Sequence, residues 1–431
     1  MYISKISLKN IRGFKSLEFN LDRGNGEYAG WTVFTGDNGS GKTTLIRAIA
    51  IGIAGKDVAR SILPTFRGWI RENANDEASI ALKIASVPGD DRRLGRPSKA
   101  PFEAVLAFER SEGPEPALVS KSPAKSKKAP IANQSIWSTN PQGWFACGYG
   151  PFRRVFGASA EAQRLMSAPS TSRWVTLFNE AATLREVDEW LKDIKYKALE
   201  EKEDQKKELD VVLAILRDEF LPREIQIDGI DSGGLWLRDA NGARLSWTEM
   251  SDGYRAAVAL LSDILRHMIH TYGFEGLYEQ DKDGKVYIKR SGVVLIDEID
   301  AHLHPSWQRE IGFWLKRHFP YVQFLVTSHS PIILQAADPN GLFVLPEPGS
   351  DDPPHPLSKE EYQQVITSRP DTILRSPAFG NMPNTRSEPV VDKRARYSRL
   401  QAKKRAGGKL SAAEADELMD LLPFVSTDEG E

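Results

Sequence analysis

Hydrophobic and polar residues alternate in several short segments near the N-terminus, which is typical of strands with one buried face. Two such strands are expected within residues 1–20, on either side of Asn10–Phe14. Ala78–Ala85 and Phe102–Phe108 alternate in the same way, and the intervals Val87–Pro101 and Ser111–Pro130 have the composition of loops. These segments predict an antiparallel β layer in the N-terminal part of the chain.

Other segments are mostly apolar, as expected for parallel strands that are buried on both faces. They are Trp31–Thr35, the start of Phe145–Arg154, Val293–Ile296 and Phe324–Val326. From Ser251 onward, helical and strand patterns alternate, which predicts a parallel core.

Helical spacing of apolar residues extends over Thr183–Phe220, with an interruption across Glu200–Glu208. Sustained heptads are missing, so we do not expect a long coiled coil. A β-hairpin should follow, with strands Leu235–Arg238 and Arg244–Trp247 joined by a turn at Asn241–Gly242.

Composition indicates a soluble globular protein. The 431 residues are 40% hydrophobic and 27% charged, with a net charge of −2, so any nucleic-acid contact must come from local patches. Cys147 is the only cysteine, which excludes internal disulfides. Neither a secretory apolar run nor a stretch of about 18 uncharged apolar residues occurs. We expect a cytoplasmic protein that does not enter a membrane.

Gly36–Thr43 fits the pattern G-x-x-x-x-G-K-[ST] at every fixed position, between the strand Trp31–Thr35 and a predicted helix from Leu45. Glycines let backbone N–H groups surround a β-phosphate, Lys42 reaches the β- and γ-phosphates, and the Thr43 hydroxyl can ligate Mg²⁺. We therefore predict a site for ATP or GTP with Mg²⁺, formed by Gly36, Asn38, Gly39, Ser40, Gly41, Lys42, Thr43 and Thr44.

The strand Val293–Ile296 ends in two acids, Asp297 and Glu298. Asp297 fits a ligand of the Mg²⁺ shell, and Glu298 fits a group that polarises the attacking water. Another apolar strand ends in His329, which taken alone is more simply explained as a core or turn imidazole. Because three elements of phosphate chemistry follow in order, we assign His329 to the same site.

Met250–Arg255 is predicted to open a helix, with Ser251 as its N-cap and Gly253 in its first turn. The free N–H groups there could bind an anion, although an ordinary capped amphipathic helix is the alternative. Its position, about 40 residues before Asp297, matches the signature motif of ATP-binding-cassette ATPases.

Together, five segments resemble the SMC/RecF/OLD-like class of ABC-type ATPases: NIRGF (10–14), GDNGSGKTT (36–44), MSDGYR (250–255), LIDEIDAHLHP (295–305) and TSHSP (327–331). The resemblance implies an α/β fold, an ABC-type P-loop NTPase core with a mixed sheet, flanking helices and an antiparallel β layer. We expect the N-terminal half of the core at 1–155, a short helical lobe at 156–225, the C-terminal half at 226–345, and a linker with a helical extension at 346–431.

The same resemblance implies a homodimer, able to build higher oligomers, in which Lys42 of one protomer and Ser251 of the other sandwich one ATP. It implies Glu298 as the hydrolytic base, His329 as a γ-phosphate switch and Asp300 as a residue that communicates across the dimer. Arg12 corresponds to a basic residue near the nucleotide.

The chain also departs from the class. Residues 341–431 do not show the acidic pattern of a Toprim nuclease, and the usual glutamine lid has only two candidates, Gln142 and the turn Tyr149–Arg153. A short lobe without a nuclease is most similar to stand-alone ATPases of antiphage systems such as Septu, which act with a separate HNH nuclease. We expect an ATPase that controls such an effector. The alternatives are a RecF-like DNA repair ATPase, or a nuclease with its own metal site.

The C-terminal segment predicts a helical hairpin. Its first helix carries seven basic residues within 393–405, and the second begins at a capping box, Ser411 and Glu414. The basic helix could bind nucleic-acid phosphates or form a solvated face beside the acidic residues 412–431. We expect the hairpin to dock a partner protein or a second ATPase dimer.

Overall fold

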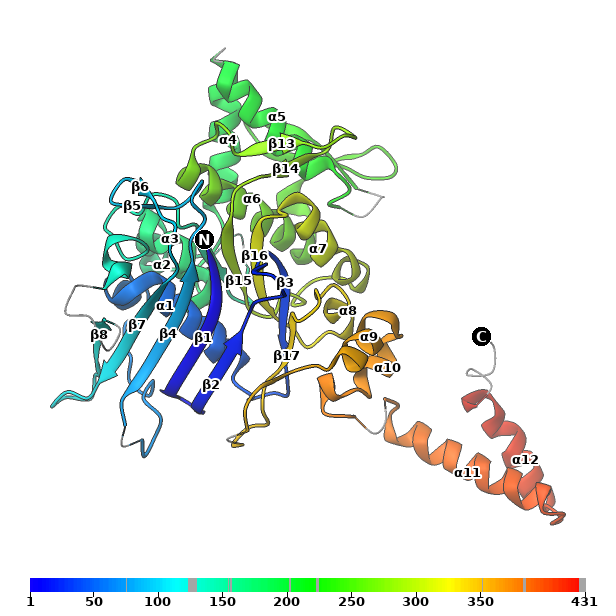
Figure 1. Ribbon diagram of the computed structural model, residues 1–431. Helices are drawn as coiled ribbons and strands as arrows, with labels where there is room; N and C mark the ends of the chain where they lie inside the picture. The colour runs from blue at the N-terminus through cyan, green and yellow to red at the C-terminus, as the bar shows by residue number, and fades with distance from the viewer. Residues whose placement is uncertain are drawn as a thin grey trace.

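A computed structural model describes residues 1–74, 76–122, 130–153, 155, 157–200, 203–221, 225–350, 352–382 and 385–425. Two sheets enclose helix α1 (Lys42–Ile62), which packs on the antiparallel sheet with one side and on the parallel sheet with the other (Figure 1). The predicted mixed α/β core is therefore confirmed.

The antiparallel sheet has five strands in the order β2-β1-β4-β7-β8, which are Phe14–Asn20, Tyr2–Ile11, Ala78–Ala85, Phe102–Glu109 and Ala117–Lys121. Its apolar positions face α1, and a Cβ atom at Gly52 would lie only 2.7 Å from Leu82 Cδ1. Helix and sheet are thus in direct contact through a glycine.

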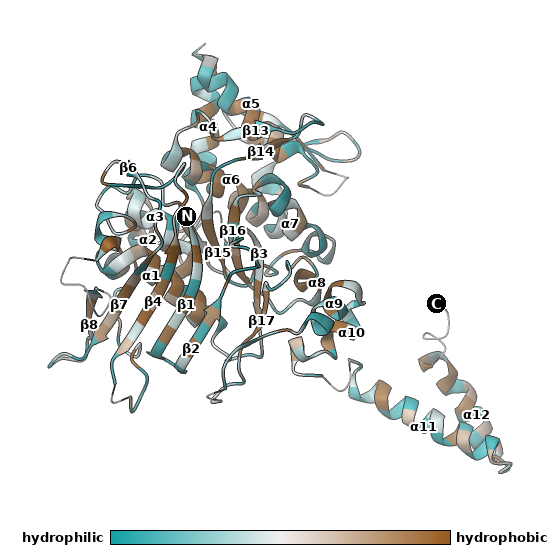
Figure 2. Ribbon diagram, in the orientation of Figure 1, coloured by the Kyte–Doolittle hydropathy of each residue, from teal (hydrophilic) through white to brown (hydrophobic). Residues whose placement is uncertain are grey.

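The second sheet has six strands in the order β18-β17-β3-β16-β15-β9, which are His355–Pro356, Leu342–Val344, Gly30–Thr35, Val322–Thr327, Gly292–Ile296 and Ala146–Tyr149. All are parallel except β18. Helices α6 (Asp252–Tyr272) and α7 (Pro305–His318) contribute to the core on the face that does not contact α1. Figure 2 shows apolar residues concentrated in these strands.

The helical lobe contains α2 (Ala160–Met166), α3 (Pro169–Phe178), α4 (Glu186–Leu199) and α5 (Glu203–Arg217). The last two lie within the predicted helical segment Thr183–Phe220, and α5 begins at Glu203, inside the interval where the apolar spacing is interrupted. A small sheet follows, formed by β10 (Gln226–Asp231), β11 (Gly234–Arg238) and β12 (Arg244–Ser246), and a hairpin by β13 (Tyr278–Gln280) and β14 (Val286–Ile288). No helix in the described part of the chain has the length and apolar composition that crossing a membrane requires.

Several predicted boundaries were wrong. The hairpin strand ends at Ser246, because that side chain caps the 3₁₀ turn Trp247–Glu249 in a capping box. The predicted loops contain strands: β5 (Arg92–Arg93), β6 (Arg96–Pro97) and β8, which pairs with the edge of β7. A run rich in lysine extends over Lys121–Lys128. Lys121 forms ion pairs with Glu77 and with Glu109, whereas residues 123–129 lie outside the described residues.

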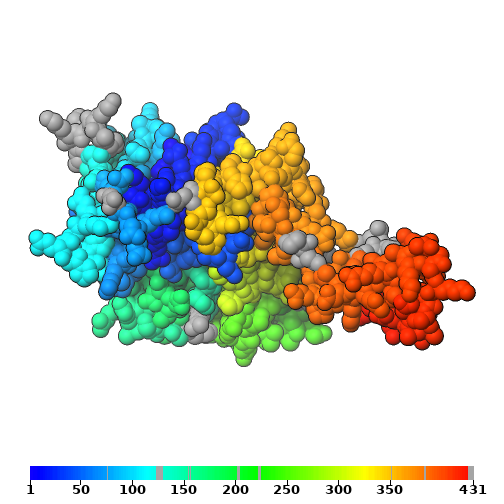
Figure 3. Space-filling view, turned by 90° about the horizontal axis from the view of Figure 1, so that it is seen from below, coloured from blue at the N-terminus to red at the C-terminus, as the bar shows by residue number. Residues whose placement is uncertain are grey.

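Helix α8 (Pro331–Leu334) precedes β17. Beyond β17, the chain continues through α9 (Lys359–Thr367) and α10 (Pro370–Leu374) to a helical hairpin of α11 (Glu388–Arg405) and α12 (Ala412–Leu421). The hairpin stands away from the body in Figure 1 and again in Figure 3. It has its own small core and is therefore the predicted hairpin. Two basic residues of α11 bind acids of α12: Arg396 lies 2.8 Å from Glu417, and Lys403 lies 2.8 Å from Glu414.

A buried polar cluster joins α6 to β9. The Asp263 carboxylate accepts hydrogen bonds from Tyr149 Oη at 2.9 Å and from Arg266 Nη2 at 2.7 Å, and His267 Nε2 lies 3.3 Å away. Burial favours the protonated acid, but the charges of His267 and Arg266 outweigh it and hold the pKa of Asp263 well below its usual range. The carboxylate is therefore ionised.

We expect Asp263→Asn to lower the free energy of unfolding by about 3 kcal/mol, because it removes the counter-ion of a buried guanidinium. Urea unfolding at pH 7 followed by circular dichroism measures the change. Asp210→Asn, on the exposed face of α5, is the matched control and should stay within about 0.5 kcal/mol of wild type. Equal effects of the two changes would contradict a structural role for the cluster.

Candidate nucleotide site

The phosphate loop (Gly36–Gly41) connects β3 to α1, and close packing fixes its shape. Gly41 has φ 93°, and a Cβ atom there would lie 2.4 Å from Phe14 Cζ. A Cβ atom at Gly36, where φ is 144°, would lie 2.9 Å from Ser40 Oγ. The glycines are thus required both by conformation and by space, and Phe14 places the turn Asn10–Phe14 against the loop.

Lys42 holds its amino group over the phosphate loop. Its Nζ donates to the carbonyl oxygens of Gly36 and Asp37, both at 2.8 Å. Burial lowers the pKa of Lys42, while Asp297 and Glu298 act in the opposite direction. The hydroxyl Oγ of Ser40 is buried and makes no hydrogen bond within the described residues. The loop therefore presents a cation and an unused hydroxyl on one side.

The remaining loop residues are more accessible. Asn38 and Gly39 are exposed, and Thr43 and Thr44 are half-buried in the first turn of α1. The structure therefore brings together every residue that the glycine-rich motif predicted.

The acidic turn (Asp297–Ala301) follows β15. Thr327, at the end of β16, donates its hydroxyl to Asp297 Oδ1 at 2.6 Å and accepts the backbone N–H of Glu298 at 2.7 Å. Asp297 Oδ2 is buried without a hydrogen-bond partner in the described chain. Glu298 has φ 47°, a strained conformation for a residue with a side chain. Because Mg²⁺ prefers carboxylate oxygens, the unpaired Oδ2 beside the phosphate loop fits a metal ligand.

His329 follows β16 and is half-buried. Burial lowers the pKa of His329, and the nearby charge of Lys42 lowers it further, so the imidazole is neutral at pH 7. The preceding Ser328 donates to Asp300 Oδ1 at 2.6 Å. The charges of Lys42 and of the acidic turn therefore both act on His329.

Arg153 is a site residue that no motif identified. It follows β9, is 4% exposed, and donates to four carbonyl oxygens of the acidic turn: those of Asp297, Glu298 and Ile299 at 3.2 Å and that of Ala301 at 3.0 Å. Burial lowers the pKa of Arg153 to about 10, although the neighbouring acids oppose this. The guanidinium remains charged and fixes the backbone that carries Glu298. The sequence placed Arg153 only at the end of a turn that was a candidate for the lid, and did not indicate its hydrogen bonds to the acidic turn.

Of the two candidates for the lid, only the turn Tyr149–Arg153 lies at the site. Gln142 precedes β9, at the opposite end of this strand, and the prediction that named it is wrong for this physical reason. Tyr149, the last residue of β9, pairs with Ile296 next to the acidic turn, so the residues that follow β9 lie at the site and those that precede it do not.

The signature segment (Met250–Arg255) lies beside the acidic turn. Ser251 is the N-cap of α6, is exposed, and makes no side-chain cap bond. A Cβ atom at Gly253 would lie 2.4 Å from the carbonyl oxygen of His302, so glycine allows the helix to approach the chain after that turn. The start of α6 is therefore open to a partner.

Arg12 occupies the turn next to the phosphate loop. It has φ 48°, and its guanidinium lies 4.6 Å from the ring centre of Trp69. Burial lowers the pKa of Arg12, and Arg47 lowers it further, which shows that two cations lie close together here. The structure places Arg12 near the loop without showing a nucleotide contact.

Comparisons with known proteins agree with this geometry. A family model described as "AAA domain" matches residues 5–227, which is 223 of the 431 residues. A second model, described as "AAA domain, putative AbiEii toxin, Type IV TA system", matches residues 145–335. The crystal structure of an SMC head bound to the C-winged helix domain of ScpA is similar in fold, with a TM-score of 0.50 at 15% identity, over 84% of this chain and 100% of that chain.

Three curated relatives are longer than this chain. The Septu protein PtuA of Bacillus mycoides (strain KBAB4) is 25% identical over 372 residues, which are 85% of this chain and 42% of that protein. The Retron Ec83 probable ATPase of Escherichia coli is 38% identical over 109 residues, 25% of this chain and 18% of that protein. The Retron Vc95 probable ATPase of Vibrio cholerae serotype O1 biovar El Tor is 36% identical over 107 residues, 25% of this chain and 19% of that protein. The chain thus spans less than half the length of these relatives.

We expect Arg153→Lys to loosen the acidic turn, because an ammonium group cannot reproduce the planar fork that reaches four carbonyls. Hydrogen exchange at residues 297–301 should accelerate by at least about tenfold, while nucleotide binding at the phosphate loop persists. Arg164→Lys, on the exposed side of α2, is the control. Unchanged exchange would show that the turn does not depend on Arg153.

Proposed function

The chain belongs to the AAA domain family, and on that premise we propose that it hydrolyses ATP to ADP and phosphate as an SMC/RecF-like ATPase. The observation that carries the proposal is the pair Asp297 and Glu298, held by one Thr327 hydroxyl beside Lys42. A cation for the phosphates, a metal ligand and a carboxylate for water therefore share one edge of the sheet.

The residues divide the reaction between them. Lys42 and the loop N–H groups bind the β- and γ-phosphates, while Thr43 and Asp297 Oδ2 would hold Mg²⁺. When bound, Mg²⁺ neutralises charge that develops on the phosphate oxygens. Glu298 orients a water molecule and accepts its proton as the water oxygen bonds to the γ-phosphorus and the bond to ADP breaks. Neutral His329 can donate a hydrogen bond to the γ-phosphate.

A second copy of the chain completes the site in this proposal. Ser251 at the start of α6 is exposed, and the Gly253 contact fixes this helix terminus beside the acidic turn. An anion-binding helix terminus without its own lysine fits a phosphate that another protomer holds. We therefore propose an ATP-dependent homodimer, able to form larger oligomers, with Asp300 close to the shared surface.

Similarity to a Septu protein across 85% of the chain, and to two retron ATPases, supports a role in antiphage defence. In that role, the ATP-bound dimer would control a nucleic-acid-directed effector such as an HNH nuclease. The helical hairpin α11–α12, which stands away from the body, is a suitable surface for docking the effector (Figure 3).

We expect Glu298→Gln to reduce kcat by at least about a hundredfold and to accumulate an ATP-bound dimer, since the amide cannot accept the proton of water. Light scattering after size exclusion, with and without ATP and Mg²⁺, measures the dimer. Glu310→Gln on α7 is the matched control and should behave as wild type. A Glu298→Gln protein that stays monomeric with ATP would disprove the sandwich.

Ser251→Arg tests the other half of the composite site. The larger cationic side chain should leave ATP binding to the phosphate loop intact but prevent closure of the dimer, so that phosphate release falls to the level of Lys42→Ala. Equilibrium binding of a fluorescent ATP analogue and phosphate release, measured on the same sample, separate the two effects. Normal hydrolysis by Ser251→Arg would show that the α6 terminus does not contact nucleotide.

A further inference from the structure

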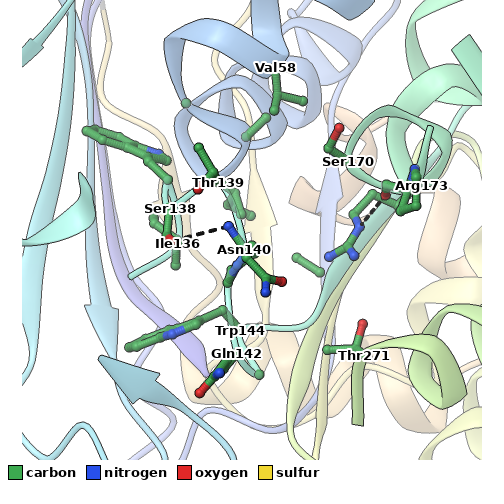
Figure 4. A pocket seen from close by; sticks show the side chains of 18 of the residues that line it. Val58, Ile136, Ser138, Thr139, Asn140, Gln142, Trp144, Ser170, Arg173 and Thr271 are labelled. Carbon is green, nitrogen blue, oxygen red and sulfur yellow. Dashed lines mark hydrogen bonds between the residues drawn. The ribbon is translucent and has the colours of Figure 1, made fainter. Parts of the chain in front are cut away.

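A cavity of about 1120 Å³ lies away from the phosphate loop. Its walls come from the second half of α1, the segment 133–144, the start of α3 and the end of α6 (Figure 4). Ile53, the first residue of α1 at the cavity, is about 16 Å along the helix from Lys42. The first residue of β9, Ala146, lines the cavity, whereas the last, Tyr149, lies beside the acidic turn. The cavity is therefore separate from the nucleotide site.

Arg173 on α3 is largely buried in this wall without an acidic partner. Its Nε donates to the carbonyl oxygen of Pro169 at 3.3 Å, and within the described residues no carboxylate pairs with its guanidinium. Burial lowers the pKa of Arg173, and the groups that oppose this are Cys147, Tyr272 and Tyr149, none of them an acid of ordinary strength. Figure 4 shows the guanidinium pointing into the cavity. A cation buried without a counter-ion is costly, so an anionic ligand would stabilise it.

The other charged residues of the wall also favour an anionic ligand. His270 lines the same cavity as Arg173, and burial, followed by the charge of Arg173, lowers the pKa of His270. The wall contains four basic residues, Lys56, Arg92, Arg173 and Arg290, and two acidic residues, Asp57 and Asp90. Asp90 is already engaged, since its Oδ1 lies 3.0 Å from Arg290 Nη1. The cavity thus carries an excess of positive charge.

The segment 133–144 contributes an aromatic ring and side-chain amides to the wall. Trp137 is fixed where α1 breaks: a Cβ atom at Gly55, which has φ 77°, would lie 2.5 Å from the indole, and Trp137 Nε1 donates to the Gly52 carbonyl at 3.0 Å. The side-chain amides of Asn140 and Gln142 have no hydrogen-bond partner in the described part of the chain, and Figure 4 shows Asn140 at the cavity. An aromatic face with free amides is the set of groups that recognises a nucleobase.

We propose that this cavity is a second binding site, for a mononucleotide, with its phosphate held by Arg173 and His270 and its base held by Trp137 and Asn140. The volume of about 1120 Å³ slightly exceeds the range of about 300–1,000 Å³ that is usual for small-ligand pockets, and it is far more than a single phosphate needs. The combination of an unpaired guanidinium with free amides therefore favours a nucleotide over inorganic phosphate.

The test uses the full-length chain carrying Lys42→Ala, which weakens the phosphate-loop site, and titrates AMP, GMP, CMP and UMP by calorimetry. Monophosphates also lack the β-phosphate that the loop grips. We expect one mononucleotide per chain. Adding Arg173→Gln should weaken binding by at least about tenfold, because it removes a charge-assisted hydrogen bond. Arg164→Gln, which does not line the cavity, should leave the affinity unchanged.

Asn140→Asp is a second test that leaves the protein core intact, because Asn140 is exposed. It replaces the amide that holds the base by a carboxylate, which cannot donate a hydrogen bond and adds a negative charge to a cavity for an anionic ligand, so it should weaken mononucleotide binding without changing the unfolding midpoint. If Arg173→Gln does not fold, Asn140→Asp tests the proposed mononucleotide site in its place. Three results would overturn the proposal: no mononucleotide binds, inorganic phosphate binds equally well, or only a single-stranded oligonucleotide binds.

Discussion

Parallel pairing of β3, β16, β15 and β9 places the ends of four strands at one edge of the sheet, and each end carries a functional group. Ile296 pairs with Val326 and Tyr149, and Thr327 pairs with Phe34. The residues that follow these positions therefore meet although they are far apart in the chain. Thr327 then joins two ends directly, because one hydroxyl binds Asp297 and the backbone of Glu298. A shift of one residue in this register would separate the acids from the phosphate loop.

Arg153 and Arg173 both have guanidinium groups that are largely removed from solvent, but their hydrogen-bond partners differ. Arg153 gives its hydrogen bonds to carbonyl oxygens of the acidic turn, so that its burial is compensated and the turn becomes rigid. Arg173 has a single backbone bond and no acid in the described chain. The first residue is thus part of the structure of the site, whereas the second is left with unused bonding capacity. This contrast is the physical basis for assigning a ligand to the cavity.

Sequence patterns predicted most of the core, because both strand types have strong periodicity and the phosphate loop has fixed spacing. The hydrogen bonds of Arg153 to the acidic turn were not predicted, because its partners are backbone carbonyls and no pattern of side chains encodes them. Strand β8 was missed because an edge strand with one partner needs little apolar alternation, and β10 because its register is interrupted near Gly229. Gln142 was a plausible lid from its residue type alone, but strand direction puts it at the wrong end of β9. The domain limits at 155, 225 and 345 remain predictions.

Helices α1 and α6 connect the two regions physically. Each begins at the nucleotide site, α1 with Lys42 and α6 with Ser251 at its N-cap, and each ends at the cavity, with Ser61 and Tyr272 in its wall. The Asp263 cluster fastens α6 to β9, and β9 leads to Arg153. A ligand that bridges Arg173 and Trp137 would contact the far end of α1 and lie close to the far end of α6. α1 is interrupted at Gly55, whereas α6 is continuous, and a packed continuous helix transmits small displacements along its length. Occupancy of the cavity would therefore act through α6 on the position of the signature segment, which the ATP-dependent dimer that we propose has to fix relative to the phosphate loop.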